Sequence, residues 1–450
     1  MTLPRGAPGR TILAADLTRH SFAPSSRAGR RIGAEVELLP IDVESRRVAP
    51  LEDGSRALLP LLRTFAAQRC WTEGRTEKNT PCFSLPGGGR MTFEPGGQLE
   101  YSAPPARGVS ALVRDVRGVL EPLRARVSRD GIDLVALGID PHRDVADAPL
   151  QLRADRYARM DAYFATIGSF GARMMRQTAS FQVCLDAEDE GSARWHVLND
   201  AAPYVTAIFA NSSRYAGALT TQQSVRAECW RRLDPARTGM IAGERPINAY
   251  LAFALAAPDM MRKSASGEYA AFGDWLDAGD ASLDDWHHHL STLFPDVRPR
   301  GYFEVRGADA IDAAWCVAPL ALLGGIAYDS DAQAEALSLL GGADQELLER
   351  AGTAGLRDAR IATTAAQLVE IALRGCDALG PDFLNPGDME GARDFFARYT
   401  LRARSPADDA RNLVTSQRHV SAYDARRLMV STPPENHDLG DEDRENSEEK

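Results

Sequence analysis

Acidic residues at alternate positions of strand-like segments are the feature that most constrains this chain. In residues 300–309, RGYFEVRGAD, Glu304 and Arg306 share one face of an extended strand, because successive side chains point to opposite faces. Phe303 and Val305 fall on the other face. A surface strand with one ion pair would explain this segment by itself. Three further segments repeat the pattern, which indicates a sheet with one charged face.

Each of the three segments carries polar side chains on one strand face. They are 31–40 with Glu35 and Glu37, 91–102 with Gln98 and Glu100, and 177–186 with Thr178, Ser180, Gln182, Cys184 and Asp186; Glu94 lies just before the Pro-Gly-Gly turn of the second segment. Carboxylates are costly to bury unless a cation compensates them. Carboxylate and amide oxygens are ligands of hard cations, and an arginine suits phosphate. This oxygen-rich set favours magnesium or manganese over zinc.

The order of elements predicts an α+β fold. Strands bearing acids alternate with helices and hairpins up to Asp309, and the rest is largely helical. We expect one curved, mainly antiparallel sheet with helices outside it. Residues 1–29 are predicted to be a flexible lead-in with a short helix near residues 13–19. Residues 30–430 are expected to form a single domain with a helical C-terminal part, and the acidic segment 431–450 is expected to be disordered because it lacks apolar anchors.

Charge and hydropathy exclude several classes of protein. Of the net charge of −11, residues 431–450 contribute eight acidic and two basic residues, so the body is only mildly acidic and nothing favours nucleic acid. No apolar run approaches the ~20 residues that span a bilayer, and the N-terminus lacks a signal-peptide core. We therefore expect a cytoplasmic protein, a monomer or homodimer. The six cysteines contain no CxxC pair and are expected to be reduced.

Some chemically suggestive residues have simpler interpretations. Residues 287–289 are three histidines, but neighbouring helical residues point about 100° apart and cannot bind one ion together. We expect a surface cluster with one histidine packed inward. The glycines at 87–89 can approach a phosphate or form a hairpin tip, and the tip is the simpler interpretation. Asp309 either supports the charged face or caps a helix.

Five segments in order resemble glutamate–cysteine ligases of the plant and bacterial type. They read IGAEVELLP, FEPGGQLEYS, TASFQVCLDA, LDPARTG and DDWHHHLSTLFPDVRPRGYFEVRGADA, and the resemblance as a whole covers roughly residues 31–328. The segment FQVCLDA is most similar to the actinobacterial ligases that catalyse the first step of ergothioneine biosynthesis. The plant enzymes act in glutathione biosynthesis. The resemblance implies a funnel-shaped antiparallel sheet related to glutamine synthetase. It also implies ATP-dependent joining of L-glutamate to L-cysteine through a γ-glutamyl phosphate.

The resemblance also implies roles for particular residues. The magnesium-binding positions of the family correspond to Glu35, Glu37, Glu94, Glu100, Gln182 and Glu304. Arg306 matches the arginine that meets the transferring phosphate, so Arg306 and Glu304 are the expected catalytic residues. Arg226 is expected to grip the glutamate substrate, with Thr178, Ser180 and Tyr157 as further substrate contacts; for Tyr157, packing explains the position equally well. Where the plant enzymes have an arginine this chain has Gln177, with Arg176 one residue earlier.

Two alternatives remain open at this point. A carboxylate–amine ligase could join glutamate to a different amine, and the Gln177 departure leaves room for that. A metal-dependent phosphotransferase or hydrolase could use the same acidic cluster. The sequence does not determine the acceptor amine, the oligomeric state, the number of metal ions, the regulation, or the pathway that uses the product.

Overall fold

The computed structural model describes residues 8–23, 30–187, 193–241 and 243–415. It divides the chain into two compact units, residues 1–408 and 409–450. The predicted acidic tail lies outside the described residues. All of the sheet and the candidate site belong to the first unit.

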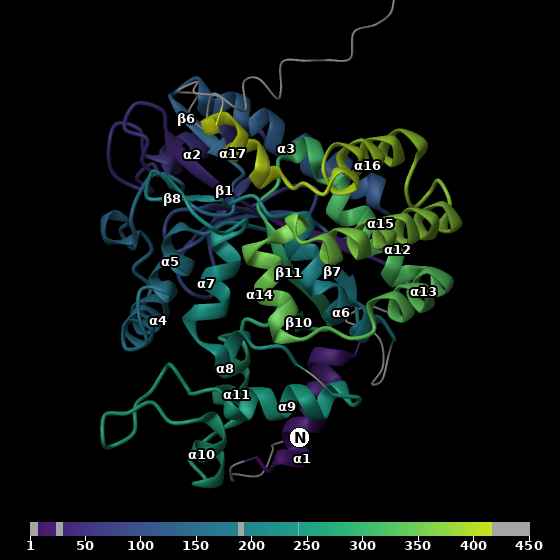
Figure 1. The fold of residues 1–450 in the computed structure, drawn as a ribbon. Helices are drawn as coiled ribbons and strands as arrows, with labels where there is room; N and C mark the ends of the chain where they lie inside the picture. The colour runs from purple at the N-terminus through teal and green to yellow at the C-terminus, as the bar shows by residue number, and fades with distance from the viewer. Residues whose placement is uncertain (1–7, 24–29, 188–192, 242, 416–450) are drawn as a thin grey trace, which may run out of the picture. The chain divides into compact units, whose positions relative to one another are not determined.

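Within the described residues, nine strands form one antiparallel sheet (Figure 1). They are β1 Ile32–Asp42, β2 Thr72–Arg75, β3 Pro81–Ser84, β4 Arg90–Phe93, β5 Leu99–Ser102, β6 Ile132–Val135, β7 Ser180–Asp186, β10 Val297–Pro299 and β11 Tyr302–Asp309. The strand order is β10-β11-β7-β1-β5-β4-β3-β2, and β6 also pairs with β1. A separate two-stranded hairpin joins β8 Arg214–Tyr215 and β9 Ala218–Leu219. The predicted α+β fold with a mainly antiparallel sheet is therefore confirmed.

The long central strand β1 explains the shape of the core. Its alternating Ile32, Ala34, Val36 and Leu38 are all buried, so they belong to the hydrophobic core. Glu35 and Glu37 alternate with them and share the other face. One continuous strand therefore carries both the core and the acidic residues.

Helices surround the sheet. Before β10 they are α1 Arg10–Leu17, α2 Leu58–Gln68, α3 Val109–Ser128, α4 Asp155–Ala165, α5 Phe170–Gln177, α6 Ala193–Ile208, α7 Val225–Leu233, α8 Pro235–Thr238, α9 Pro246–Ala256, α10 Phe272–Asp277 and α11 Leu283–Leu290. After β11 they are α12 Val317–Tyr328, α13 Ser330–Leu340, α14 Gln345–Thr353, α15 Ala359–Leu379, α16 Pro386–Arg398 and α17 Pro406–Thr415. Short 3-10 turns lie at Val145–Asp147, Ala313–Trp315, Gly355–Arg357 and Thr400–Arg402.

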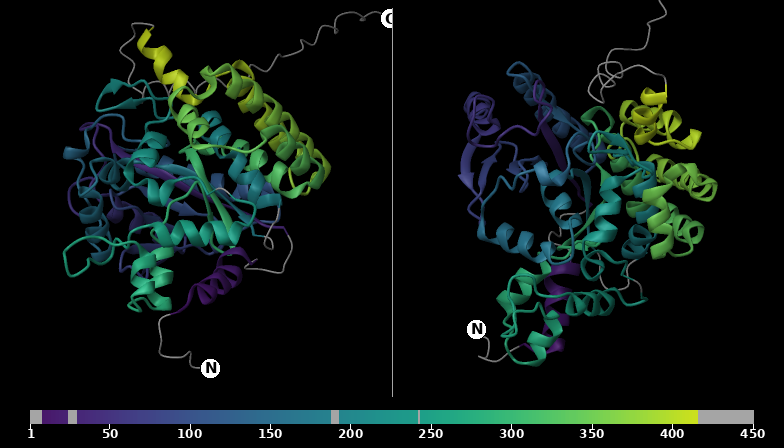
Figure 2. Two further views of the ribbon diagram at one scale, coloured as in Figure 1. Left: turned by 60° about the horizontal axis from the view of Figure 1, so that its bottom comes forward. Right: turned by 60° about the vertical axis from the view of Figure 1, so that its left-hand side comes forward.

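Helices α12 to α16 form the predicted supporting layer, drawn in green and yellow-green on one side of the strands (Figure 2). All twelve residues of α12 are buried, because this helix packs between β7 and α15. Gly325 permits the contact with α15, since a Cβ there would collide with the Ala372 carbonyl. Among the described helices, none is by itself long and apolar enough to cross a membrane; α12 with α13, bent by 99°, meets that test only as a pair.

Two local predictions need correction. The described part of the lead-in is not a flexible segment, because α1 and the π-helix Thr18–Phe22 bury Leu13, Leu17 and Phe22 in the core. The predicted strand 177–186 begins only at Ser180, since α5 continues through Gln177. The apolar spacing of the lead-in was too short to distinguish a docked helix from a free one.

Two of the simpler interpretations hold. The glycines at 87–89 form a hairpin tip between β3 and β4, where Gly88 has a φ of 92° and the Leu85 amide donates to the Gly89 carbonyl. Of the three histidines, His289 is packed inward and stacks on Phe272 with ring centroids 4.5 Å apart.

Candidate active site

Strand register brings the predicted acidic residues together. Glu37 of β1 lies opposite Glu100 of β5, and Glu35 lies opposite Gln182 of β7. Glu94 joins them from the turn that follows β4. Carboxylate oxygens of Glu37, Glu94 and Glu100 all lie within 4.8 Å of one another. Four separate segments of the chain therefore supply one cluster.

The turn that carries Glu94 depends on its glycines. The Gly97 amide donates to the Glu94 carbonyl at 2.8 Å, and Gly97 has a φ of 89°, which L side chains rarely adopt. At Gly96 a Cβ would collide with the Arg176 carbonyl at the end of α5. The sequence EPGGQ therefore folds tightly against α5 and directs Glu94 toward β5.

Burial without a matching cation destabilises the charged forms of these carboxylates. It raises the pKa of Glu37 and of Glu94, and in each case a neighbouring carboxylate adds to the shift. Burial, then repulsion from Glu94, raises the pKa of Glu100 to about 7. Burial, then Glu304 and Glu100, raises that of Glu35 to about 8. A divalent cation bound here would remove this penalty, so the residues fit a hard metal ion.

The opposite end of the site is cationic. Arg298 of β10 donates to both oxygens of Glu304, from Nε at 2.6 Å and from Nη2 at 3.1 Å. Arg306 Nη1 donates to Oε2 of the same carboxylate at 3.0 Å. Burial alone would raise the pKa of Glu304, but Arg298, Arg306 and Arg300 together hold it below its ordinary value. Glu304 therefore stays ionised and fixes two guanidinium groups.

Gln182 connects the two ends. Its Oε1 accepts from Arg306 Nη1 at 2.7 Å, and its Nε2 donates to Glu37 Oε1 at 3.0 Å. The amide offers an acceptor and a donor on one planar group without a change of protonation. A continuous hydrogen-bonded path therefore runs from Glu304 through Arg306 and Gln182 to Glu37. A glutamate at position 182 could not make the second bond without a proton.

A β-bulge shapes the strand that carries Arg306. The pairing of β11 with β7 shifts register between Val305 and Ala308, and such irregularities re-aim side chains next to functional sites. Arg226 of α7 lies behind this point and donates from Nη2 to the Arg306 carbonyl at 2.7 Å. Its guanidinium also lies 4.5 Å from the Trp230 ring centroid. Arg226 is thus buried against the backbone of β11.

Asp309 supports Arg226 from the end of β11 and caps no helix. Its carboxylate accepts from the Asn211 amide at 2.7 Å, from Ser212 Oγ at 2.7 Å and from Ser224 Oγ at 2.8 Å. It also lies 3.9 Å from Arg226. Of the two interpretations of Asp309, the structure supports the first.

A cavity of about 1550 Å³ is lined by Arg298 and Arg300, the two arginines of β10 and its turn that pair with Glu304. Six basic and five acidic residues line it, and the basic ones include Lys78, Arg156, Arg298 and Arg300. Tyr157 lies at the same place, where Lys78 Nζ is 5.8 Å from its ring centroid, and burial followed by Glu94 raises its pKa. Glu304 lies behind the cavity lining, because Arg298 and Arg300 contact it.

Thr178 and Ser180, which were predicted to contact substrate, make hydrogen bonds within the protein. The Thr178 hydroxyl donates to the Met174 carbonyl of α5 at 2.7 Å, so it is hydrogen-bonded at the end of that helix. This geometry does not support a substrate contact from that hydroxyl. Ser180 contributes its backbone amide, which donates to Glu37 Oε2 at 2.7 Å.

Arg176 and Gln177 also lie outside the cluster. Arg176 Nη2 pairs with both oxygens of Asp161 at 2.6 Å. Gln177 is buried and donates to the Arg143 carbonyl at 2.9 Å. The expected difference in strand face does not arise, because both residues belong to α5.

Sequence reasoning missed the roles of Arg298, Arg300 and Lys78. A signal for the first was present: the Gly301 turn, with a φ of 75°, pairs Arg298 with Glu304 across the β10–β11 hairpin. Lys78 gave no such signal, since it lies in the loop between β2 and β3 and meets the site only through tertiary packing.

Comparisons with known proteins agree with the chemistry of this site. Residues 31–421 match the model of the family described as glutamate-cysteine ligase family 2 (GCS2). The chain is 34% identical over 352 residues to glutamate–cysteine ligase EgtA of Mycolicibacterium smegmatis, covering 74% of this chain and 80% of the relative. It is 29% identical over 321 residues to the chloroplastic glutamate–cysteine ligase A of Oryza sativa subsp. indica, covering 67% and 63%.

Among solved structures, a bifunctional glutathione synthetase from Pasteurella multocida aligns with a TM-score of 0.47 and 13% identity. The alignment covers 88% of this chain and 51% of that chain.

Proposed function

Because this chain belongs to glutamate-cysteine ligase family 2, we propose that it joins the γ-carboxylate of L-glutamate to the α-amine of L-cysteine at the expense of ATP. The γ-carboxylate attacks the terminal phosphorus of ATP and gives γ-glutamyl phosphate and ADP. The amine of cysteine then attacks the acyl carbon, expels inorganic phosphate and loses a proton. The product is γ-glutamylcysteine.

The single observation that carries this proposal is the hydrogen-bonded path between a carboxylate cluster and a fixed arginine. Phosphoryl transfer between two anions requires groups that neutralise and align them, and needs no nucleophile from the protein. Arg306 is held by Glu304 and Gln182 and leaves its Nε without a partner. That guanidinium is the group we assign to the transferring phosphate.

The carboxylate cluster is the proposed site for magnesium. Glu37, Glu94 and Glu100 would be its ligands, with Glu35, Gln182 and Glu304 at its edge. A bound magnesium ion supplies positive charge to the phosphate oxygens of ATP. Hydrogen bonds from the chain fix the orientation of two of these carboxylates. Thr92 Oγ1 donates to Glu100 at 2.6 Å, and the Ser180 amide donates to Glu37.

The cavity is the proposed route for the substrates. Lys78 and Arg156 line it beside Tyr157, and Arg298 and Arg300 line the part next to Glu304. ATP and the glutamate carboxylates are all anionic, so these four basic side chains are the groups proposed to contact them. We propose that Arg226 binds the glutamate substrate, as predicted. Because it packs on the backbone of β11, we also propose that it positions Arg306.

The test is ADP formation by the purified protein with ATP, magnesium and L-glutamate, with and without L-cysteine, and mass spectrometry of the product. We expect a cysteine-dependent rate and the mass of γ-glutamylcysteine. ADP release with water alone would indicate a phosphohydrolase and contradict the proposal.

Variants connect the activity to the site. Glu37→Gln and Arg306→Ala should lower kcat/KM by at least about 10²-fold, because each removes charge that is present where the phosphoryl group transfers. Glu335→Gln is the matched control, since this carboxylate pairs with Arg374 on the exposed face of α13 and α15. Near wild-type turnover in either site variant, or an equal loss in the control, would contradict the assignment.

The acceptor amine needs its own measurement. L-alanine, L-serine and simple amines should compete poorly with L-cysteine for product formation at equal concentration. If cysteine turned over no better than alanine, the mechanism would stand, and the chain would join glutamate to another amine.

A further inference from the structure

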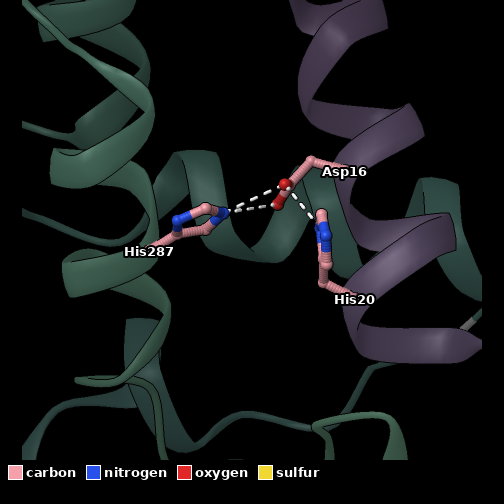
Figure 3. Close-up of side chains that lie close together, drawn as sticks. All are labelled: Asp16, His20 and His287. Atoms are coloured by element: carbon pink, nitrogen blue, oxygen red, sulfur yellow. Dashed lines mark hydrogen bonds and ion pairs between the residues drawn. The ribbon is translucent and has the colours of Figure 1, made fainter. Parts of the chain in front are cut away.

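A second group of metal-ligating side chains lies away from the carboxylate cluster, between the N-terminal helices and α11 (Figure 3). Asp16 and His20 come from α1 and the π-helix that follows it, and His287 comes from α11. His20 Nδ1 lies 2.8 Å from Asp16 Oδ1, and His287 Nε2 lies 3.0 Å from the same oxygen. One atom of each residue lies within 4.8 Å of the others.

These separations suit a transition-metal ion. With bonds of about 2.0–2.2 Å to nitrogen and oxygen, neighbouring ligand atoms of a tetrahedral zinc ion are roughly 3.3 Å apart. The two His–Asp separations differ from that value by only a few tenths of an ångström. Three protein ligands would leave one position for water. Two imidazoles and one carboxylate favour zinc over magnesium, which prefers oxygen ligands.

The surroundings prepare the carboxylate and leave the imidazoles accessible. Trp286 Nε1 donates to Asp16 Oδ2 at 3.2 Å, and such outer hydrogen bonds fix the orientation of metal ligands. The Asp16 side chain is 8% exposed, whereas those of His20 and His287 are 65% and 49% exposed. A metal ion can therefore reach the two imidazole nitrogens from solvent.

The backbone also distinguishes this place. The Ala23 amide donates to the Thr18 carbonyl at 2.9 Å, the i→i+5 bond of a π-helix, and π-turns within helices occur frequently at functional sites. His20 lies in that wide turn, and the turn joins directly to α1.

We propose that Asp16, His20 and His287 form a zinc-type site that fastens the N-terminal helices to α11. The same three residues line the substrate cavity, together with Arg298 and Arg300. An ion bound there would hold one rim of the cavity in place. This proposal is independent of the ligase reaction, because it uses none of the residues assigned to catalysis.

Zinc binding to the magnesium-saturated protein tests the proposal. Isothermal titration is done on protein in which Cys70→Ser has removed an exposed thiol, with excess magnesium to fill the carboxylate cluster. We expect one zinc ion per chain. His20→Gln and His287→Gln should each weaken its binding at least tenfold, whereas His288→Gln, on the same helix but outside the cluster, should leave it unchanged.

Glutamine is chosen because its amide can still donate to Asp16, which separates metal binding from a simple hydrogen-bonded tether. Thermal melting of each variant without zinc checks that it folds. Cobalt(II) in place of zinc should give the visible absorption of nitrogen and oxygen ligands, lost in both variants. Absence of saturable zinc binding, or binding unchanged in either variant, would overturn the proposal.

Discussion

The metal-free protein should lose stability as the pH rises, because burial, and then repulsion between neighbouring carboxylates, raises the pKa values of its buried glutamates. The ordinary pKa of Glu35 is 4.5, and in the folded protein it is raised to about 8. A group whose pKa is raised on folding stabilises the protein fully below its unfolded pKa and loses that contribution as the pH rises through the folded value.

The magnitude follows from linkage. Between pH 6.5 and 8.5, a carboxyl with a folded pKa near 8 and an unfolded pKa near 4.5 changes the free energy of unfolding by about 2 kcal/mol. Glu100, with a folded pKa of about 7, changes it in the same direction. His289 has the opposite sign, because burial lowers its pKa to about 3 and its contribution is lost as the pH falls below its unfolded value.

Urea denaturation measures this directly. EDTA-treated wild-type protein, the same protein with saturating magnesium, and Glu35→Gln are compared at pH 6.5 and 8.5. Magnesium and Glu35→Gln should each reduce the loss by about 2 kcal/mol, because the first compensates the charge and the second removes it. The contribution of His289 is the same in all three samples, so it cancels when their pH dependences are compared. An identical pH dependence in all three samples would refute the reasoning.

Three further outcomes follow from the contacts. Gln182→Glu should lower turnover by at least about 10²-fold in the ADP assay, since it adds a charge to the cluster and removes an amide donor; unchanged turnover would contradict the hydrogen-bonded path. Thr178→Val should retain activity while losing about 1 kcal/mol of stability in urea, because its hydroxyl ends α5; a large loss of activity would restore its predicted substrate contact. Gly325→Ala should cost about 1–3 kcal/mol, whereas Gly118→Ala, with nothing within 4 Å of the added Cβ, should stabilise α3 by up to about 1 kcal/mol; equal effects would contradict the close approach at Ala372.

The alternation of residues determined which side chains share a face. The period of a strand is two, so the acids of β1 and of β5 could be assigned to one face from sequence alone. The hairpin between β10 and β11 was equally local, because its turn fixes the pairing of Arg298 with Glu304. The antiparallel sheet and the family followed from such short segments, and both are confirmed.

Other parts of the site depended on contacts between distant segments. Where a strand begins is decided by packing, so α5 extended through Gln177 and moved Thr178 away from its predicted position. Lys78 lines the cavity only because its loop folds toward α4.

The sequence by itself determined the chemistry of this protein, since residue type and local spacing fix which ligands and charges a strand can present. Only the tertiary structure decided which of them meet. Asp16 and His287 are separated by 271 residues, and neither has a local pattern that relates it to the other. Their proximity results from the docking of α1 against the rest of the core, where Leu13 and Leu17 are buried.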